Sequence, residues 1–231
     1  MTDKKKDYKE RLLKAFPESL KQDVIVVIDI LPLDNYKVKL CDGETHKVDN
    51  LIHSSTITVQ LNGKLLTIPY RLYFDEPNKE KEDKLTEKQK VILNCIYLRH
   101  HNGFLRQERL ERLADSKEYW VIPFTFQLLG EYVFEILEVL EKHINERNIE
   151  NYIRYKLENP RYFQQTESRM ISYWNEYYRR PLFPKLKDYI GKKLIDKIKQ
   201  QKTTANIIGL KRITPNAQHP VKHCSWRSVA I

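Results

Sequence analysis

Two adjacent histidines, His100 and His101, are of a residue type that takes part in catalysis and in metal binding. They stand in the stretch LRHHNGFLRQERLERL, between an apolar run and an Asn-Gly pair. Catalysis or metal binding would need further groups, and no Cys or carboxylate stands at ligand spacing within this segment. We therefore interpret both histidines as polar residues at the C-terminus of a helix, where an imidazolium complements the helix dipole.

Arginines follow the histidines at intervals of three and so lie near one face of the expected second helix. A helix, a short glycine-containing turn and a second helix are the parts of a helix-turn-helix motif. Most antiparallel helix pairs do not bind DNA, so nucleic-acid contact here is a minor alternative. Its candidate residues are Arg106 and Arg109, with Arg112 beside them.

Carboxylates offer a second possible chemistry, because Glu131, Glu135 and Glu138 share one side of an expected helix. Di-metal helical bundles pair such residues with a Glu-x-x-His motif on partner helices, and the chain contains none. A solvated acidic face is the favoured interpretation. The stretch HPVKHC near the C-terminus has ligand-like residues, but a zinc site normally takes four clustered ligands.

Known catalytic motifs are missing from the sequence. The pattern of a restriction-type nuclease fails, because no acidic residue stands two positions before Lys37 or Lys39. No Walker-type glycine loop and no Gly-x-Ser-x-Gly elbow occur. The sequence therefore predicts no catalytic residue, no metal and no cofactor, although it leaves an enzyme assembled from separate segments open.

Positive charge is concentrated in the last third of the chain. Residues 151–231 hold 17 Lys and Arg against 5 Asp and Glu, whereas residues 1–150 hold 24 against 26. The stretch NPRYFQQTESRMISYWNEYYRRP interleaves tyrosine with arginine on an expected amphipathic helix, and a lysine-rich helix follows. Such surfaces suit a phosphate backbone with exposed bases. The candidate contacts are Arg169, Tyr173, Arg179, Arg180, Lys192, Lys193 and Lys197.

The elements that must position these residues begin with an amphipathic helix in DYKERLLKAF. Residues 24–30, VIVVIDI, are β-branched and apolar, which predicts a buried strand, and residues 36–40 alternate as a second strand. Residues 56–61 and 66–72 alternate around Asn62-Gly63, which predicts a β-hairpin. Pro69 places the second strand of the hairpin at an edge.

Helical patterns dominate after residue 84. A capping box at Thr86 and Gln89 predicts a helix start, and Gly103 predicts a helix end in the left-handed conformation. A long apolar stripe over residues 122–144 predicts one mostly buried helix, with a bend near NERN. Asn159-Pro160 predicts the start of the next helix. A basic helix follows over residues 184–202, and residues 201–231 are expected to form a flexible basic tail.

Together these patterns predict an α+β protein, with a small N-terminal antiparallel sheet containing a β-hairpin, followed by a larger all-helical domain. The expected parts are residues 1–74, a charged exposed linker at residues 75–84, a helical domain at residues 85–200, and the tail. The three cysteines form no disulfide framework, and no apolar signal or membrane-spanning run occurs. We therefore expect a cytoplasmic protein without membrane association.

The preferred function is that of a non-catalytic protein whose basic C-terminal third contacts nucleic acid, either DNA or RNA. Two alternatives stay open. The chain is a protein-interaction or scaffold subunit that docks an acidic protein partner, since Tyr and Arg often anchor interfaces. The weaker alternative is an enzyme without a recognisable motif.

Overall fold

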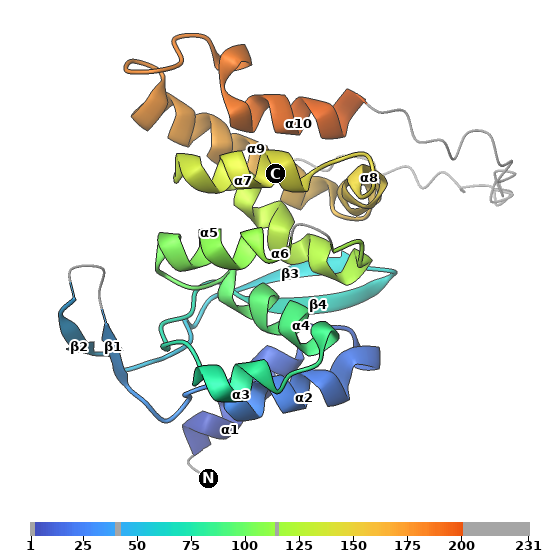
Figure 1. Cartoon of the computed structure of the whole chain (residues 1–231). Helices are drawn as coiled ribbons and strands as arrows, with labels where there is room; N and C mark the ends of the chain where they lie inside the picture. Colours follow the sequence, from blue (N-terminus) through green and yellow to red (C-terminus); the bar gives the residue numbers. More distant parts are fainter. Residues whose placement is uncertain (1–2, 40–42, 114–115, 201–231) are drawn as a thin grey trace, which may run out of the picture.

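The computed structural model describes residues 3–39, 43–113 and 116–200, and these form an α+β fold with a helical majority, as the sequence predicts. Figure 1 shows α1 and α2 at one end, α9 and α10 at the other, and the β3–β4 hairpin between them. The elements are α1 (Asp3–Leu13), α2 (Lys21–Ile30), β1 (Lys37–Lys39), β2 (Thr45–Lys47), β3 (Thr56–Leu61), β4 (Lys64–Pro69), α3 (Lys79–Asp83), α4 (Glu87–Tyr97), α5 (Gly103–Glu111), α6 (Ile122–Phe126), α7 (Phe134–His143), α8 (Ile149–Glu158), α9 (Pro160–Tyr173) and α10 (Ile190–Gln200).

The expected strand over residues 24–30 is wrong, because the segment lies within helix α2. Val24, Val27 and Ile28 are buried at helical spacing, and α2 packs against both α1 and α4. Val26 points outward and stays 44% exposed. The helix-compatible spacing and the packing therefore override the β propensity of the individual residues.

Two small antiparallel sheets contain the described strands. The β1–β2 pair joins Val38 to His46, and the β3–β4 hairpin joins Val59 to Leu66. Asn62 and Gly63 both take positive φ, of 55° and 75°, so the predicted two-residue turn is confirmed. Beyond β4 the chain stays extended, and Leu72 forms isolated bridges with Ile52 and His100. The bridge between Leu72 and His100 joins the extended segment after β4 to the residues that follow α4.

The helical segments begin and end for local reasons. The capping box of Thr86 and Gln89 at the start of α4 is confirmed. The expected left-handed Gly103 is wrong: Asn102 instead accepts a hydrogen bond from the Phe104 N–H and caps the start of α5. Since α4 ends at Tyr97, residues 98–102 form the connection between the two helices.

The single helix expected over residues 122–144 is also wrong. It divides into α6, a 3₁₀ turn at Gln127–Gly130 and α7. A Cβ at Gly130 would lie 3.3 Å from the Thr166 carbonyl oxygen, so the glycine lets α9 pack closely on this turn. With this break, Glu131 is buried, whereas Glu135 and Glu138 on α7 are exposed.

The C-terminal helices follow the sequence more closely. The bend between α7 and α8 is confirmed, and Pro160 is the first residue of α9, as predicted. A π-helical turn at Trp174–Tyr178 extends α9. The basic helix begins later than expected, at Ile190, and buries Leu194 and Ile198. Residues 201–231, the expected tail, lie outside the described residues.

One contiguous apolar core includes residues from α1 through α10. The expected linker is partly ordered by α3, and Glu82 of that helix is half-buried. The division into an N-terminal and a helical domain stays a prediction. Within the described ranges, no helix combines the length and the apolar character needed to cross a bilayer.

Candidate functional site

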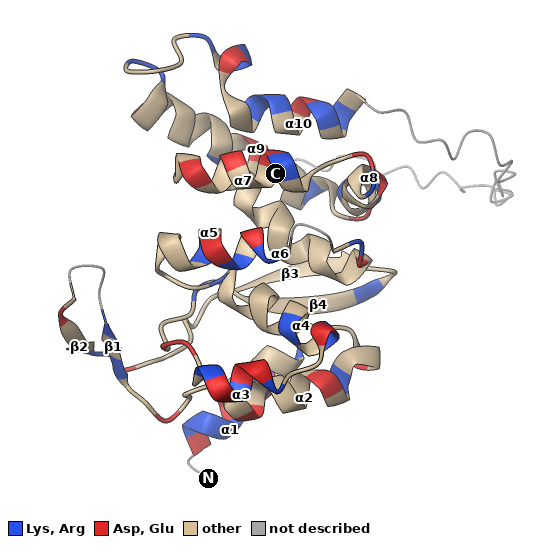
Figure 2. Cartoon of the chain, viewed as in Figure 1, with Lys and Arg blue, Asp and Glu red and all other residues tan. Residues whose placement is uncertain are grey.

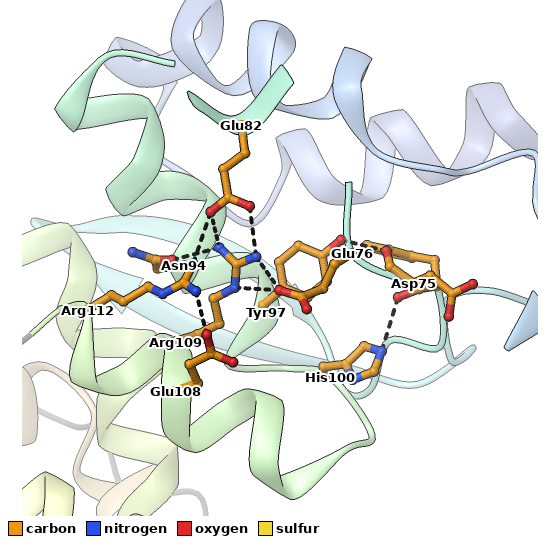
Figure 3. A network of polar contacts seen from close by, with 10 residues as sticks. Asp75, Glu76, Glu82, Asn94, Tyr97, His100, Glu108, Arg109 and Arg112 are labelled. Atoms are coloured by element: carbon orange, nitrogen blue, oxygen red, sulfur yellow. Dashed lines mark hydrogen bonds and ion pairs between the residues drawn. The ribbon is translucent and has the colours of Figure 1, made fainter. Parts of the chain in front are cut away.

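Arg109, one of the sequence-predicted contacts, lies inside the protein and is 1% exposed. Its guanidinium donates hydrogen bonds to Glu76 and Glu82 and to the Asn94 side chain, 3.1 Å away. Figure 3 shows this network joining α5 to the segment around α3. Burial alone would lower the pKa of Arg109, but hydrogen bonds to Glu82 and Glu76 and their charges raise it.

Glu82 also receives a hydrogen bond from Arg112, 3.1 Å away, and Arg112 pairs with Glu108. A cavity of about 530 Å³ opens beside this network. Two carboxylates therefore compensate the buried charge of Arg109. The contacts indicate a clamp that fastens residues 76–82 to α4 and α5, and they leave Arg109 no free donor for a ligand.

His100 is buried and neutral. Burial, with the neighbouring His101 as a second cause, lowers its pKa to about 3. Its Nε2 lies 3.0 Å from the Phe74 carbonyl oxygen, and its Nδ1 accepts a hydrogen bond from the Asn102 N–H at 3.1 Å. Both ring nitrogens thus have backbone partners, which fits a structural role but not the charged form that a helix dipole would favour.

Arg106, the other predicted contact on α5, is also buried. It donates hydrogen bonds to the carbonyl oxygens of His100 and His101, and its Nη2 lies 3.1 Å from Glu131 Oε2. Glu131 is buried too, which contradicts the expected solvated acidic face at that position, although Glu135 and Glu138 are exposed. Arg71 Nη1 stands 4.0 Å from Glu131 Oε1.

Arg99, at the end of α4, is 1% exposed and has no ion pair in the described part of the chain. Its Nε donates a hydrogen bond to the Pro69 carbonyl oxygen at 2.8 Å, and its Nη2 donates to Tyr70. Burial lowers the pKa of Arg99 to about 10, so the group still carries its charge at neutral pH. We call Arg71, Arg99 and Arg106, grouped around Glu131, the arginine cluster.

Three tyrosines form an aromatic surface next to this cluster. The rings of Tyr132 and Tyr173 lie 5.6 Å apart, and Tyr177 is 5.9 Å from Tyr132 and 6.1 Å from Tyr173. Tyr132 and Tyr177 are 48% and 52% exposed. We call these three residues the tyrosine patch.

The tyrosine patch lies close enough to the arginine cluster for the charges of the two to interact. Burial raises the pKa of Tyr173, and Tyr70 and Glu131 raise it further, whereas Arg169 lowers it. Arg169 is half-buried on α9 and forms no ion pair with another described residue. The fold thus brings predicted residues of α9 together with Tyr70, which follows β4, and Glu131, which follows the 3₁₀ turn.

The other predicted contacts are less concentrated. Arg179 and Arg180 are exposed after the π-helical turn, and Arg179 lies over the Trp174 ring at 5.6 Å. On α10, Lys192 pairs with Asp196, and Lys197 donates a hydrogen bond to the Ile144 carbonyl oxygen at 2.6 Å. Lys193 is exposed. Figure 2 shows Lys and Arg along α10 and in the segment that precedes it.

Sequence reasoning missed Arg71, Arg99 and Tyr132 as site residues. The first two meet only because the chain after β4 pairs with the end of α4 through Leu72 and His100. The one local signal was the density of arginine and tyrosine in YRLYF and YLRHH. Across the described residues, no group of three or more His, Cys, Asp or Glu side chains is placed to hold a metal ion.

Comparisons of the chain with protein-family models, with curated proteins and with solved structures find no significant match. The geometry of the arginine cluster and the tyrosine patch is therefore the basis for a functional proposal.

Proposed function

We propose that the protein binds single-stranded nucleic acid across the tyrosine patch. The observation that carries the proposal is the contact among three tyrosines, two of them about half exposed, beside Arg169, which has no ion pair with another described residue. Bases stack on aromatic rings with little sequence preference, each contact being worth about 1–3 kcal/mol. Arginine beside such rings supplies charge for the phosphates.

Charge around the patch supports the same ligand. Arg169 adjoins Tyr173, and Arg179 and Arg180 follow Tyr177 closely in the chain. The last 81 residues contribute a balance of +12, which favours association with a polyanion. The proposal therefore keeps Arg169, Tyr173, Arg179 and Arg180 as contacts, with Lys193 as a more distant one. It does not use Arg106 and Arg109 as surface contacts.

A salt titration with fluorescent single- and double-stranded oligonucleotides tests the proposal. Tyr177→Ala should weaken single-strand binding by about 1–3 kcal/mol for the lost stacking contact. The slope of log K against log salt should stay unchanged, because no charge is removed. Tyr177→Phe is the matched control, since it keeps the ring, and it should bind like the wild type.

Charge variants should behave in the opposite way. The double change Arg179→Gln and Arg180→Gln should reduce the salt slope by about 0.7 for each lost phosphate contact. Lys37→Gln, an exposed residue of β1, is the control and should leave the slope unaltered. An affinity at about 0.15 M salt no better than ~10⁻⁴ M would mean only non-specific association. That result would favour an acidic protein partner at the same Tyr and Arg surface.

A further inference from the structure

The arginine cluster carries more positive charge than its surroundings compensate. One carboxylate, Glu131, serves this cluster: it pairs with Arg71 and Arg106, and Arg99 has no ion pair among the described residues. Arg109 alone, by contrast, receives two carboxylates, from Glu76 and Glu82. The cluster therefore has an excess of about two positive charges. Buried charges are normally paired, because an unpaired charge loses its hydration without compensation.

Unused hydrogen-bond donors accompany this excess charge. Arg99 Nη1 and Arg106 Nε are buried and have no acceptor among the described residues. Neither ring nitrogen of His101 has a partner there, and the charges of Arg106 and Arg71 contribute to the lowered pKa of that ring, whose main cause is burial. Native proteins seldom leave buried donors unpaired, so these groups call for an acceptor with several oxygens.

Access to the cluster lies at Tyr70 and Arg71. Tyr70 is 36% exposed, and its ring centroid lies 5.6 Å from the Arg71 guanidinium carbon and 5.8 Å from that of Arg99. The Arg71 side chain is 19% exposed, while those of Arg99 and Arg106 are closed off from solvent. Tyr70 and Arg71 are therefore the residues of this group that a ligand from solution would contact first.

We propose that the arginine cluster binds a phosphomonoester dianion, which, on the function proposed above, is the terminal phosphate of a nucleic-acid strand. A phosphomonoester carries about −1.5 to −2 charges at pH 7 and offers three acceptor oxygens. An internal phosphodiester carries a single negative charge and would leave the cluster positive. Arginine forks match phosphate oxygens in geometry as well as in charge.

The position of the cluster fits the end of a strand. Tyr173 has both Tyr70 and Glu131 as electrostatic neighbours, so the cluster and the tyrosine patch adjoin. A strand whose terminal phosphate occupies the cluster would place its first bases on the patch. The arginine cluster would then bind the terminal phosphate of the strand, while the tyrosine patch stacks on its first bases.

The test compares three oligonucleotides of one sequence, with a 5′-phosphate, a 3′-phosphate or no terminal phosphate. One phosphorylated form should bind at least tenfold more tightly than the unphosphorylated form. Arg71→Gln and Arg99→Gln should each remove this preference while keeping the affinity for the unphosphorylated strand. Arg112→Gln, an exposed and ion-paired arginine, is the control and should keep the preference.

A second measurement does not depend on nucleic acid. Inorganic phosphate at millimolar concentration should raise the melting temperature relative to chloride at equal ionic strength, and Arg71→Gln should abolish the rise. Because Arg71 is the most exposed member of the cluster, this variant keeps the test valid if Arg99→Gln fails to fold.

The outcomes separate the two proposals. Equal affinity for all three oligonucleotides, with no thermal effect of phosphate, would overturn the phosphate site and leave single-strand binding intact. Stabilisation by phosphate without binding of any oligonucleotide would overturn single-strand binding and assign the cluster to a free phosphomonoester. Equal stabilisation of the wild type and Arg71→Gln would overturn the assignment to this cluster.

Discussion

At the scale of single residues, two histidines are buried in the neutral form. Burial lowers the pKa of His143 to about 4, and neither of its ring nitrogens has a hydrogen-bond partner in the described ranges. Burial, with His101 beside it, lowers that of His100 to about 3. In the unfolded chain both would titrate near the usual value of about 6.5.

The folded state should therefore lose stability as the pH falls below about 6.5. Between this value and about 4 the unfolded chain binds protons that the folded chain rejects, which costs up to about 1.4 kcal/mol per pH unit and per histidine. Urea unfolding at pH 7, 6 and 5 measures the effect. His143→Leu should make the dependence shallower, and an unchanged dependence would contradict the buried neutral state of His143.

For Arg109 we predict an effect on the free energy of unfolding and none on ligand binding. Arg109→Leu removes the positive charge from Glu82, which is half-buried, and leaves Asn94 without its donor. Loss of one partner from a buried ion pair typically costs about 3–5 kcal/mol, and we expect the lower end because Glu76 reaches solvent. Chemical denaturation of the variant and the wild type measures the difference.

Arg112 is the matched control for this change. It lies on the same helix end and pairs with the same Glu82, but it is exposed. Arg112→Leu should cost less than about 1 kcal/mol, as exposed ion pairs do. Equal losses for the two variants would show that burial of Arg109 adds nothing to the network.

At the scale of elements, the sequence predicted those whose signals are local. The hairpin follows from alternation around Asn62-Gly63, and α4 follows from the Thr86 and Gln89 pair. Helix α2 was missed because its β-branched residues match a buried strand, and only contact with α1 and α4 decides between the two. The division of residues 122–144 depends likewise on the approach of α9 to Gly130.

The candidate site shows the same limit. Arg169 and Tyr173 were predicted, because their helix shows its amphipathic pattern in the sequence. Arg71 and Arg99 were missed, since they stand 28 positions apart in the sequence and only the pairing of Leu72 with His100 brings them together. Residues that meet through tertiary pairing leave no periodic trace in a single sequence.

The hairpin turn offers a direct test of backbone conformation. Gly63 has a φ of 75°, and a Cβ there would meet no atom within 4 Å. Gly63→Ala should therefore destabilise the protein by about 1–2 kcal/mol through conformational strain alone. Urea unfolding curves of the variant give the value.

Gly103 supplies the opposite case. It opens α5, and a Cβ there would make an ordinary contact of 3.5 Å with Val133. Gly103→Ala should leave stability unchanged or raise it by about 0.4–1 kcal/mol, because alanine restricts the unfolded chain. Equal destabilisation by both substitutions would exclude the turn conformation as the cause.

At the scale of the whole molecule, the apolar core continues across the charged stretch at residues 75–84. Helix α2 packs on α4, and the Phe16 ring lies 6.0 Å from Trp120 and 4.9 Å from Phe124. The Arg109 network fastens the same stretch to α5. These contacts favour one cooperative unit, whereas the charge pattern of the sequence predicts two independently folding parts.

Two tryptophans distinguish the possibilities, because Trp120 contacts Phe16, which follows α1, and Trp174 lies at the end of α9. We expect the fluorescence of Trp120→Phe and of Trp174→Phe, each combined with Trp226→Phe so that one tryptophan remains, to change at the same urea concentration as the helical circular dichroism of each variant. Chains beyond about 150 residues often unfold through intermediates, so coincidence of the probes is informative. A fragment of residues 85–200 would lack Phe16 and α2, which pack on α6 and α4, and it should show reduced helicity. Separate midpoints together with a fully helical fragment would establish two domains instead.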